Sequence, residues 1–214
     1  MRGLFRIALI ALGIMGALAA ARAVTVWLSE RRARNVFPAS QARMLLNPLR
    51  QCIMPVRRTL ERFALEPGQT VLELGPGPGY YSVQASRVIG TAGRLLCLDL
   101  QRGMLDLLAQ RLAEAGATNA TLVTADATQL PLAAASLDTA FLVTVLGEVS
   151  DQDAAIGELR RVLKPGGILG FSESLGDPDI VFLGRLRNMC RRHGFEEVAH
   201  YGSPLAYTAV FRAG

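Results

Sequence analysis

A glycine-rich turn that follows a short apolar run is the strongest chemical signal in the sequence. Residues 71–79 read VLELGPGPG, so the acid Glu73 comes first and the glycines Gly75, Gly77 and Gly79 follow at every second position. Glycine has no Cβ, so a ligand can touch the backbone of such a turn. A carboxylate at its start suits a ligand that carries an ammonium and a sulfonium, and it would repel a phosphate.

The same turn disfavours a nicotinamide dinucleotide. Such a cofactor needs the spacing G-x-G-x-x-G, with free amides that hold a pyrophosphate at a helix N-terminus. Here position 80 is Tyr80, and Pro76 and Pro78 remove two amide donors. A nicotinamide-dependent oxidoreductase remains an alternative that shares the fold, and cofactor fluorescence on titration would distinguish it.

Two more acids follow later apolar runs. Asp99, with Leu100 beside it, ends the run RLLCLD, and Asp126 with Ala127 follows TLVTA. A carboxylate at the first position can accept hydrogen bonds from both hydroxyls of a ribose. At the second, a side-chain acceptor could bind an adenine amino group while the adjacent backbone contacts the ring. Either acid alone could be a solvated turn residue, but three acids in this order indicate one nucleoside-like ligand.

These acids require a sheet whose strands end at one edge. From Thr70 onward β-like runs alternate with amphipathic helices, which predicts a mainly parallel sheet covered on both faces, with ligands beyond the strands' carboxyl ends. The expected strands are 71–74, 94–99, 121–125, 139–145, 168–172, 197–201 and 207–211. The expected helices are 81–89, 104–115, one along 155–163 that ends at Lys164–Gly167, and one from Asp177 to Gly194. A further short helical face at Val56, Leu60 and Phe63 is stopped by Pro67-Gly68.

The N-terminal segment is predicted to be a membrane anchor. Residues 7–28 carry one charge, Arg22, and match the roughly 20 residues that span a bilayer core. The division that follows is an anchor at 1–30, a connector and cover helix at 31–66, and a catalytic domain at 67–214. The alternative is a cleaved signal peptide with Ala19-Ala20-Ala21 as its cleavage site.

Charge is distributed in a way that argues against nucleic-acid binding. Residues 1–60 hold ten arginines and one acid, a balance of +9, whereas the remainder has 13 basic and 17 acidic residues, a balance of −4. The basic residues therefore flank the apolar segment rather than cover the domain. Three cysteines without a C-x-x-C pair and two histidines predict no metal site and no disulfide framework, and Cys97 is expected in the core.

The motifs together resemble a known family. VLELGPGPGYYS, LLCLDL, ADATQLPLAAASLDTAFL and ELRRVLKPGGILGFSE are similar to the blocks of class I S-adenosylmethionine-dependent methyltransferases of the type-11 family, which includes ubiquinone and menaquinone biosynthesis methyltransferases. The resemblance covers residues 69–173. Ala125 and Leu137 depart from it, where the family often has glycine and phenylalanine.

The resemblance implies a Rossmann-like seven-stranded sheet and S-adenosyl-L-methionine as the cofactor, with S-adenosyl-L-homocysteine as product. The apolar stretch at 7–28 adds one transmembrane helix before that sheet. Gly75, Gly77 and Gly79 would contact its methionine part. Asp99, with Leu100, would hold the ribose, and Asp126 and Ala127 the adenine. Tyr80 would cover the cofactor, and Glu73 would face its cationic end. Because this cofactor is cytosolic, the catalytic domain is expected on the cytoplasmic side of a single-pass membrane protein.

The acceptor is the least determined part. Glu148, in the loop after the fourth strand, is the candidate general base, and a surface acid that precedes a helix is the equal alternative. Residues 173–195 leave no room for a large lid, so cover must come from residues 38–65, which lead to the anchor. We therefore expect a small lipophilic acceptor. A non-catalytic binding or assembly protein that keeps the cofactor site is the other function considered, and methyl turnover would distinguish the two.

Overall fold

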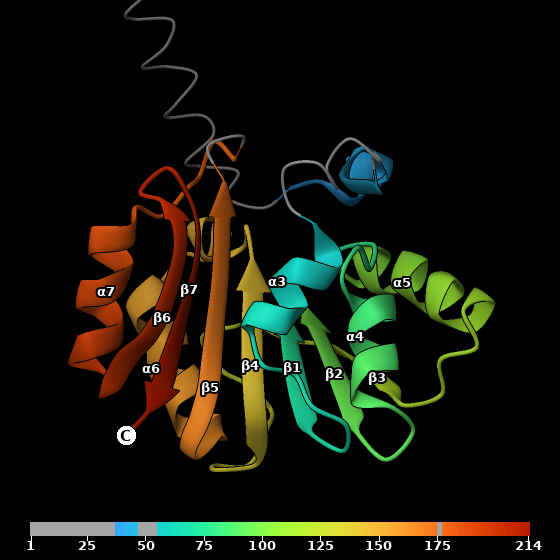
Figure 1. Cartoon of the computed structure of the whole chain (residues 1–214). Helices are drawn as coiled ribbons and strands as arrows, with labels where there is room; N and C mark the ends of the chain where they lie inside the picture. Colours follow the sequence, from blue (N-terminus) through green and yellow to red (C-terminus); the bar gives the residue numbers. More distant parts are fainter. Residues whose placement is uncertain (1–36, 47–54, 175–176) are drawn as a thin grey trace, which may run out of the picture. The chain divides into compact units, whose positions relative to one another are not determined.

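The apolar runs pair into a seven-stranded sheet of order β3-β2-β1-β4-β5-β7-β6 (Figure 1), in which β7 alone among the described strands runs antiparallel to both of its neighbours. The computed structural model describes residues 37–46, 55–174 and 177–214, which lie within one unit from Phe37 to Gly214. The strands are β1 (Thr70–Leu74), β2 (Arg94–Asp99), β3 (Ala120–Thr124), β4 (Leu137–Val143), β5 (Leu163–Ser174), β6 (Phe195–Ser203) and β7 (Ala206–Ala213). The predicted mainly parallel sheet is confirmed.

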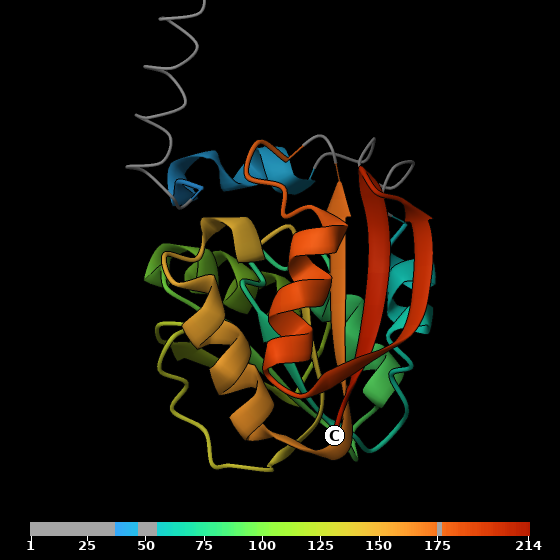
Figure 2. The ribbon, with the colours of Figure 1, turned by 90° about the vertical axis from the view of Figure 1, so that its left-hand side faces the viewer.

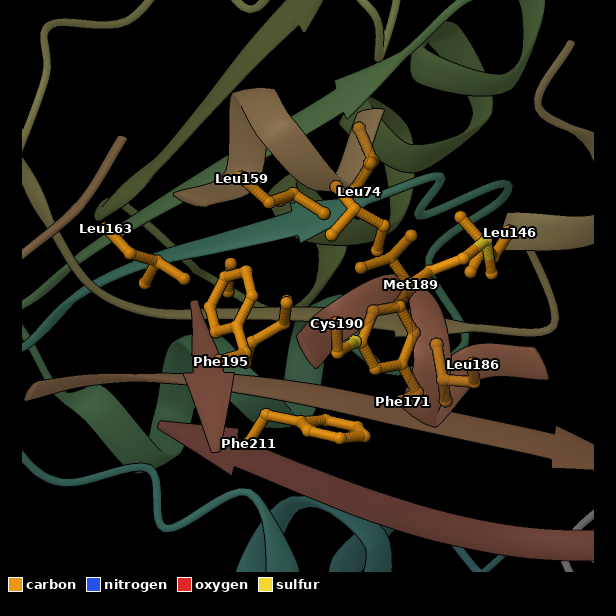
Figure 3. Packing of buried hydrophobic residues seen from close by; sticks show 14 of the residues in the cluster. Leu74, Leu146, Leu159, Leu163, Phe171, Leu186, Met189, Cys190, Phe195 and Phe211 are labelled. Atoms are coloured by element: carbon orange, nitrogen blue, oxygen red, sulfur yellow. The ribbon is translucent and has the colours of Figure 1, made fainter. Parts of the chain in front are cut away.

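Helices cover both faces because the central strands are apolar on both sides (Figures 1 and 2). One face packs against α3 (Val56–Arg62), α4 (Ser82–Ile89) and α5 (Arg102–Glu114). The other packs against α6 (Gln152–Val162) and α7 (Leu183–Arg192), where Phe171, Leu186 and Met189 interdigitate (Figure 3). Two 3-10 helices, η1 (Ala39–Leu46) and η2 (Leu146–Glu148), lie near the carboxyl ends of the parallel strands.

The predicted short helical face at Val56, Leu60 and Phe63 becomes α3, and it docks through an aromatic contact. Phe63 is fully buried and stacks on Phe141 of β4, with ring centroids 5.4 Å apart. Gly170 of β5 makes room for this ring, since a Cβ there would lie 2.2 Å from Phe63. The segment just before the predicted catalytic domain is therefore part of its core.

Two predicted boundaries are wrong. The helix expected from Asp177 begins at Leu183, because Asp177 instead forms a turn in which its side chain accepts from the Asp179 amide at 2.9 Å. The fifth strand begins at Leu163, not Ile168. The segment Lys164–Gly167, whose composition predicts a helix stop, extends β5 as an irregular stretch whose register against β4 shifts between Leu137 and Thr139.

The predicted membrane anchor lies outside the described residues. Within the described ranges, no helix combines the length and the apolar character that crossing a bilayer requires. Cys97 is buried in the core, as predicted.

A pair of glycine substitutions tests the docking of α3. Gly170→Ala should lower the free energy of unfolding by about 1–3 kcal/mol, because the new methyl group overlaps the Phe63 ring. Gly184→Ala, in α7, has open space around it and should be neutral or stabilising by up to about 1 kcal/mol. Urea unfolding of both variants measures the difference, and equal stability of the two would show that Phe63 does not pack as described.

Candidate functional site

The turn after β1 adopts the conformation that its glycines predict, but two of them serve packing. Gly75, Gly77 and Gly79 all have positive φ, at 68°, 54° and 86°. A Cβ on Gly75 would lie 2.5 Å from Val145, and one on Gly79 would lie 2.4 Å from Leu108. Only Gly77 has space at ordinary contact distance. Close approach of a ligand to the backbone is thus available at Gly77, while the other two let neighbouring elements close around the turn.

Asp99, at the end of β2, is held in place by backbone amides. Its Oδ2 accepts from the Gly77 amide at 3.2 Å, and its Oδ1 accepts from the Gln101 amide at 2.8 Å. The side chain is only 8% exposed, and burial raises its pKa. The structure therefore brings the predicted ribose acid to the glycine turn and orients its carboxylate.

Glu73 lies in β1, just before the turn, and is 4% exposed. Its Oε2 has no hydrogen-bond partner in the described part of the chain. Burial raises the pKa of Glu73 to about 8, the nearby Ser82 hydroxyl opposes the rise, and the charge of Asp99 adds to it. A buried, unpartnered carboxyl oxygen is costly unless a ligand supplies a donor. The residues present thus fit a ligand with a cationic donor at this point, as an S-adenosylmethionine site requires.

Residues 37–46, which we call the strap, lie across the carboxyl ends of the strands (Figure 2). The side chain of Gln101 donates from Nε2 to the Phe37 carbonyl at 2.7 Å and accepts at Oε1 from the Ala39 amide at 3.2 Å. Leu45 of the strap would contact a Cβ on Gly77 at 3.6 Å. The strap thus borders the glycine turn.

Glu148, the candidate base, ends η2 and joins the strap. Its Oε2 accepts from the Phe37 amide at 3.0 Å. Burial raises its pKa to about 7, the Phe37 hydrogen bond opposes the rise, and the carboxylates of Asp177, Asp179 and Asp99 add to it. A carboxyl that titrates near neutrality is poised for proton transfer.

The turn between β4 and η2 that carries Glu148 is strained. Thr144 has a positive φ of 52°, which is rare for a β-branched residue, and its amide donates to the Ser172 carbonyl at 2.9 Å. Val145, the next residue, fills the space beside Gly75. This strained residue sets the direction in which the chain leaves the sheet toward Glu148.

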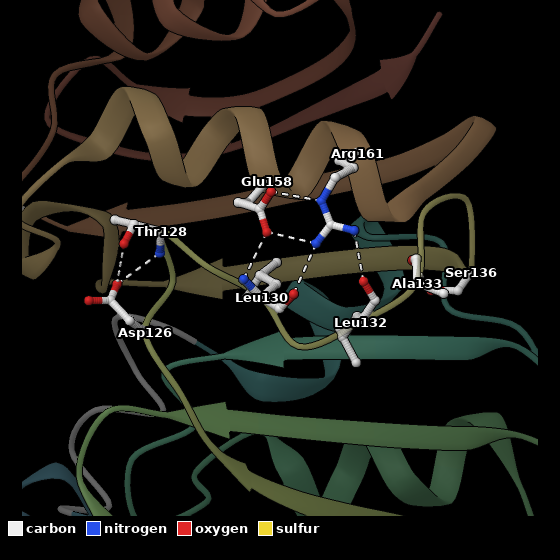
Figure 4. A network of polar contacts seen from close by, with 8 residues as sticks. All are labelled: Asp126, Thr128, Leu130, Leu132, Ala133, Ser136, Glu158 and Arg161. Atoms are coloured by element: carbon white, nitrogen blue, oxygen red, sulfur yellow. Dashed lines mark hydrogen bonds and ion pairs between the residues drawn. The ribbon is translucent and has the colours of Figure 1, made fainter.

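Asp126 lies in an exposed turn after β3, with Ala127 packed against the core beside it. Asp126 Oδ1 accepts from both the amide and the hydroxyl of Thr128 at 2.8 Å (Figure 4). The following residues are braced by the ion pair of Arg161 with Glu158, and the Arg161 guanidinium also donates to the Leu130 and Leu132 carbonyls. The adenine assignment of Asp126 and Ala127 stays a prediction.

The two remaining predicted residues flank the site differently. Tyr80 is half-buried and its ring meets Tyr81 edge-on at 5.2 Å. Leu100, next to Asp99, is 56% exposed, which is unusual for a leucine. An apolar side chain left open beside the predicted ribose acid can lie against the flat face of a base.

Sequence reasoning missed Gln101 and Glu173. Gln101 makes its contacts with the strap, 62 and 64 residues away in sequence, so no local pattern could have identified it. Glu173 lies in β5, one residue before the strand ends, is 3% exposed, and its Oε2 has no partner among the described residues. Burial and the carboxylates of Asp177 and Glu148 raise its pKa to about 8, against an opposing Val181 backbone hydrogen bond. Its position directly after the predicted strand 168–172 was the available signal.

No cluster of three or more potential metal-ligating side chains occurs within the described ranges.

Comparison with known proteins agrees with the geometry above. Residues 71–167 match the family model described as a methyltransferase domain. The ubiquinone/menaquinone biosynthesis C-methyltransferase UbiE of Haemophilus ducreyi is 34% identical over 154 residues, which cover 67% of this chain and 59% of that protein. UbiE of Vibrio campbellii is 35% identical over 132 residues, 58% of this chain and 51% of that protein.

Solved structures show the same fold. An S-adenosylmethionine-dependent methyltransferase from Aquifex aeolicus superposes with a TM-score of 0.76 at 21% identity, covering 83% of this chain and 98% of that one. The [4+2]-cyclase SpnF superposes with a TM-score of 0.65 at 21% identity, covering 74% and 79%. The chain spans between half and three fifths of the curated relatives named here. The family match, the relatives and the shared fold together show that the chain contains a class I S-adenosylmethionine-dependent methyltransferase domain, which is similar to that of the UbiE proteins.

Proposed function

We propose that this protein transfers a methyl group from S-adenosylmethionine to a small lipophilic acceptor at a membrane surface. The observation that carries the proposal is the pairing of Glu73 and Asp99 around one glycine turn. Glu73 offers an unpartnered buried oxygen, and Asp99 presents a carboxylate that two backbone amides hold. The two acids thus match the two polar parts of the cofactor, its amino-acid end and its ribose.

The residues of this chain mainly bind and align. When bound, S-adenosylmethionine supplies a methyl group on a positively charged sulfur that is already a good leaving group, so alignment and exclusion of water are what remain for the protein. The strap covers the glycine turn, and Leu100 and Tyr80 flank it. Glu148 accepts the proton that the acceptor loses from oxygen or nitrogen or, in methylation on carbon, from the ring.

The lipophilic acceptor is supported by two observations. The curated relatives are named as C-methyltransferases of ubiquinone and menaquinone biosynthesis. The sequence also has an apolar stretch at 7–28, only nine residues before the strap begins at residue 37. We propose that this stretch anchors the protein as a single-pass helix, with the catalytic domain on the cytoplasmic side. A quinone precursor dissolved in the bilayer would then reach the site at high local concentration.

The fold by itself does not distinguish methyl transfer from a binding or assembly role. SpnF, which has the same fold, is named a [4+2]-cyclase, so this fold occurs in a protein named for another reaction. Turnover of a labelled methyl group is therefore the measurement that decides between the two functions.

The cofactor site is tested by the pH dependence of binding. The ammonium of S-adenosylmethionine should prefer ionised Glu73, whose pKa is raised to about 8, so affinity should increase as pH rises from 6.5 to 8 and binding should release a proton. Glu73→Gln should weaken binding and flatten this dependence, and Asp99→Ala should weaken binding at every pH. Isothermal titration calorimetry in two buffers measures both effects. The exposed acid Glu66 provides the control Glu66→Gln, and an identical pH profile in Glu73→Gln would disprove the assignment.

The proton-accepting role of Glu148 is tested by Glu148→Gln. Because the pKa of Glu148 is raised to about 7, wild-type turnover should fall as pH drops below that value and the base becomes protonated. The variant should lose roughly 10²–10⁴-fold in kcat and also lose this limb of the pH profile, with unchanged cofactor affinity. Single-turnover transfer of a labelled methyl group is the measurement, with the exposed Glu114→Gln as control. Full activity in Glu148→Gln would leave Glu148 a structural acid.

The membrane role is tested by removing residues 1–30, which keeps the strap intact. The truncated protein should stay in solution and bind S-adenosylmethionine normally. It should lose roughly 10²-fold in turnover of a prenylated hydroquinone presented in vesicles, because the effective concentration gained by tethering is lost. Turnover of a short-chain, water-soluble hydroquinone should not change. Equal ratios of the two activities in both proteins would contradict a role of the N-terminal segment in substrate delivery.

A further inference from the structure

The side chain of Gln101 forms two hydrogen bonds with the strap backbone, as a neighbouring β-strand would. Its Nε2 donates to the Phe37 carbonyl and its Oε1 accepts from the Ala39 amide, at 2.7 and 3.2 Å, so one amide group bonds the strap backbone in both directions. Of the common side chains this long, only glutamine carries a donor and an acceptor that can do so. Glutamate has the same shape without the donor, and methionine has a similar length with neither.

Gln101 itself is held next to Asp99, which is predicted to bind the cofactor ribose. Its backbone amide donates to Asp99 Oδ1 at 2.8 Å, and it precedes α5, which begins at Arg102. The strap closes tightly on the start of this helix, because a Cβ on Gly103 would lie 3.3 Å from the Ala39 methyl group. On the other side of the strap Ala42 is 1% exposed. The strap is therefore seated on the loop that orients the predicted ribose acid.

Phe37 of the strap also contacts the candidate base Glu148. The Phe37 carbonyl accepts from Gln101, and the Phe37 amide donates to Glu148 Oε2 at 3.0 Å. The two peptide groups of one residue thus connect the loop after β2 with the loop after β4. The groups that influence the Glu148 charge from the packed elements are the Phe37 amide and the carboxylates of Asp177, Asp179 and Asp99. The amide is the one that favours the ionised form.

We propose that Gln101 is a positioning residue that clasps the strap over the bound cofactor and, through Phe37, orients the carboxylate of Glu148. The inference rests on the proposed function, since it assigns cofactor retention to the strap. It also predicts an order of events: S-adenosylmethionine enters while the clasp is open, and Glu148 is oriented only after the clasp closes. Release of S-adenosylhomocysteine then requires the clasp to open again.

Two variants of Gln101 separate the effect of its hydrogen bonds from the effect of its side-chain length and shape. Gln101→Met keeps the length and removes both hydrogen bonds, and Gln101→Glu keeps the shape and places a carboxylate against the Phe37 carbonyl. Gln101→Met loses both hydrogen bonds and should speed dissociation of S-adenosylhomocysteine by roughly tenfold or more. Gln101→Glu keeps the acceptor for the Ala39 amide but turns an oxygen toward the Phe37 carbonyl in place of the donor, so it should speed dissociation as well. Gln110, exposed on α5, provides the matched control Gln110→Met.

Two further measurements need no activity. Hydrogen exchange at the Phe37 amide should increase in both Gln101 variants, and exchange at the Ala39 amide should increase in Gln101→Met, which removes its acceptor. Carbon-13 NMR of the Glu148 carboxyl should show a higher pKa in Gln101→Met, because the hydrogen bond that favours its ionised form is weakened without any new charge, a change that a packing role for Gln101 would not produce.

The outcomes separate the inference from the proposed function. If S-adenosylhomocysteine does not bind the wild-type protein, the proposed function fails. If it binds, and the variants release it at the wild-type rate, the strap does not retain the cofactor and the inference is overturned. Faster release with an unchanged Glu148 pKa would overturn the link through Phe37.

Discussion

Two close contacts at glycine residues hold the site together at the carboxyl end of the sheet. Gly75 lies so near Val145 that a Cβ would come within 2.5 Å of it, and Gly147 lies so near Asp179 that a Cβ would be 1.7 Å from the Asp179 carbonyl oxygen. The first contact joins the turn after β1 to the turn after β4, and the second joins η2 to the segment after β5. Side chains that follow three separate strands can influence one another because these loops pack so closely at the two glycines.

Three glutamates of the site have raised pKa values. Glu73, Glu148 and Glu173 are removed from water at the end of an apolar sheet, and burial raises the pKa of each toward or above neutrality. The folded protein therefore binds protons that the unfolded chain releases above its own carboxyl pKa. These groups reduce stability as pH rises from about the ordinary pKa of glutamate through about 8. Such a cost is typical of residues kept for binding rather than for stability.

Much of this arrangement could be predicted from sequence because its signals are local. The glycine turn and Asp99 follow apolar runs directly, and parallel strands place such residues at one edge. The start of α7 and the start of β5 were mispredicted because local signals competed: Asp177 resembles a helix cap but forms its own turn, and Lys164–Gly167 resembles a helix stop but continues β5 as an irregular stretch. Gln101 could not be identified as a site residue from the sequence, because its partners in the strap lie in a segment without a recognisable pattern.

Thr144 has a consequence for any effort to engineer this protein. A β-branched residue at positive φ costs about 1–3 kcal/mol, and replacement by glycine or asparagine would recover part of that energy. A library screened for heat resistance alone would thus enrich such substitutions at position 144. The same substitutions would loosen the direction in which the chain leaves β4, and with it the placement of Glu148. Thermostability and catalytic geometry compete at this one residue, so a useful screen has to select for both.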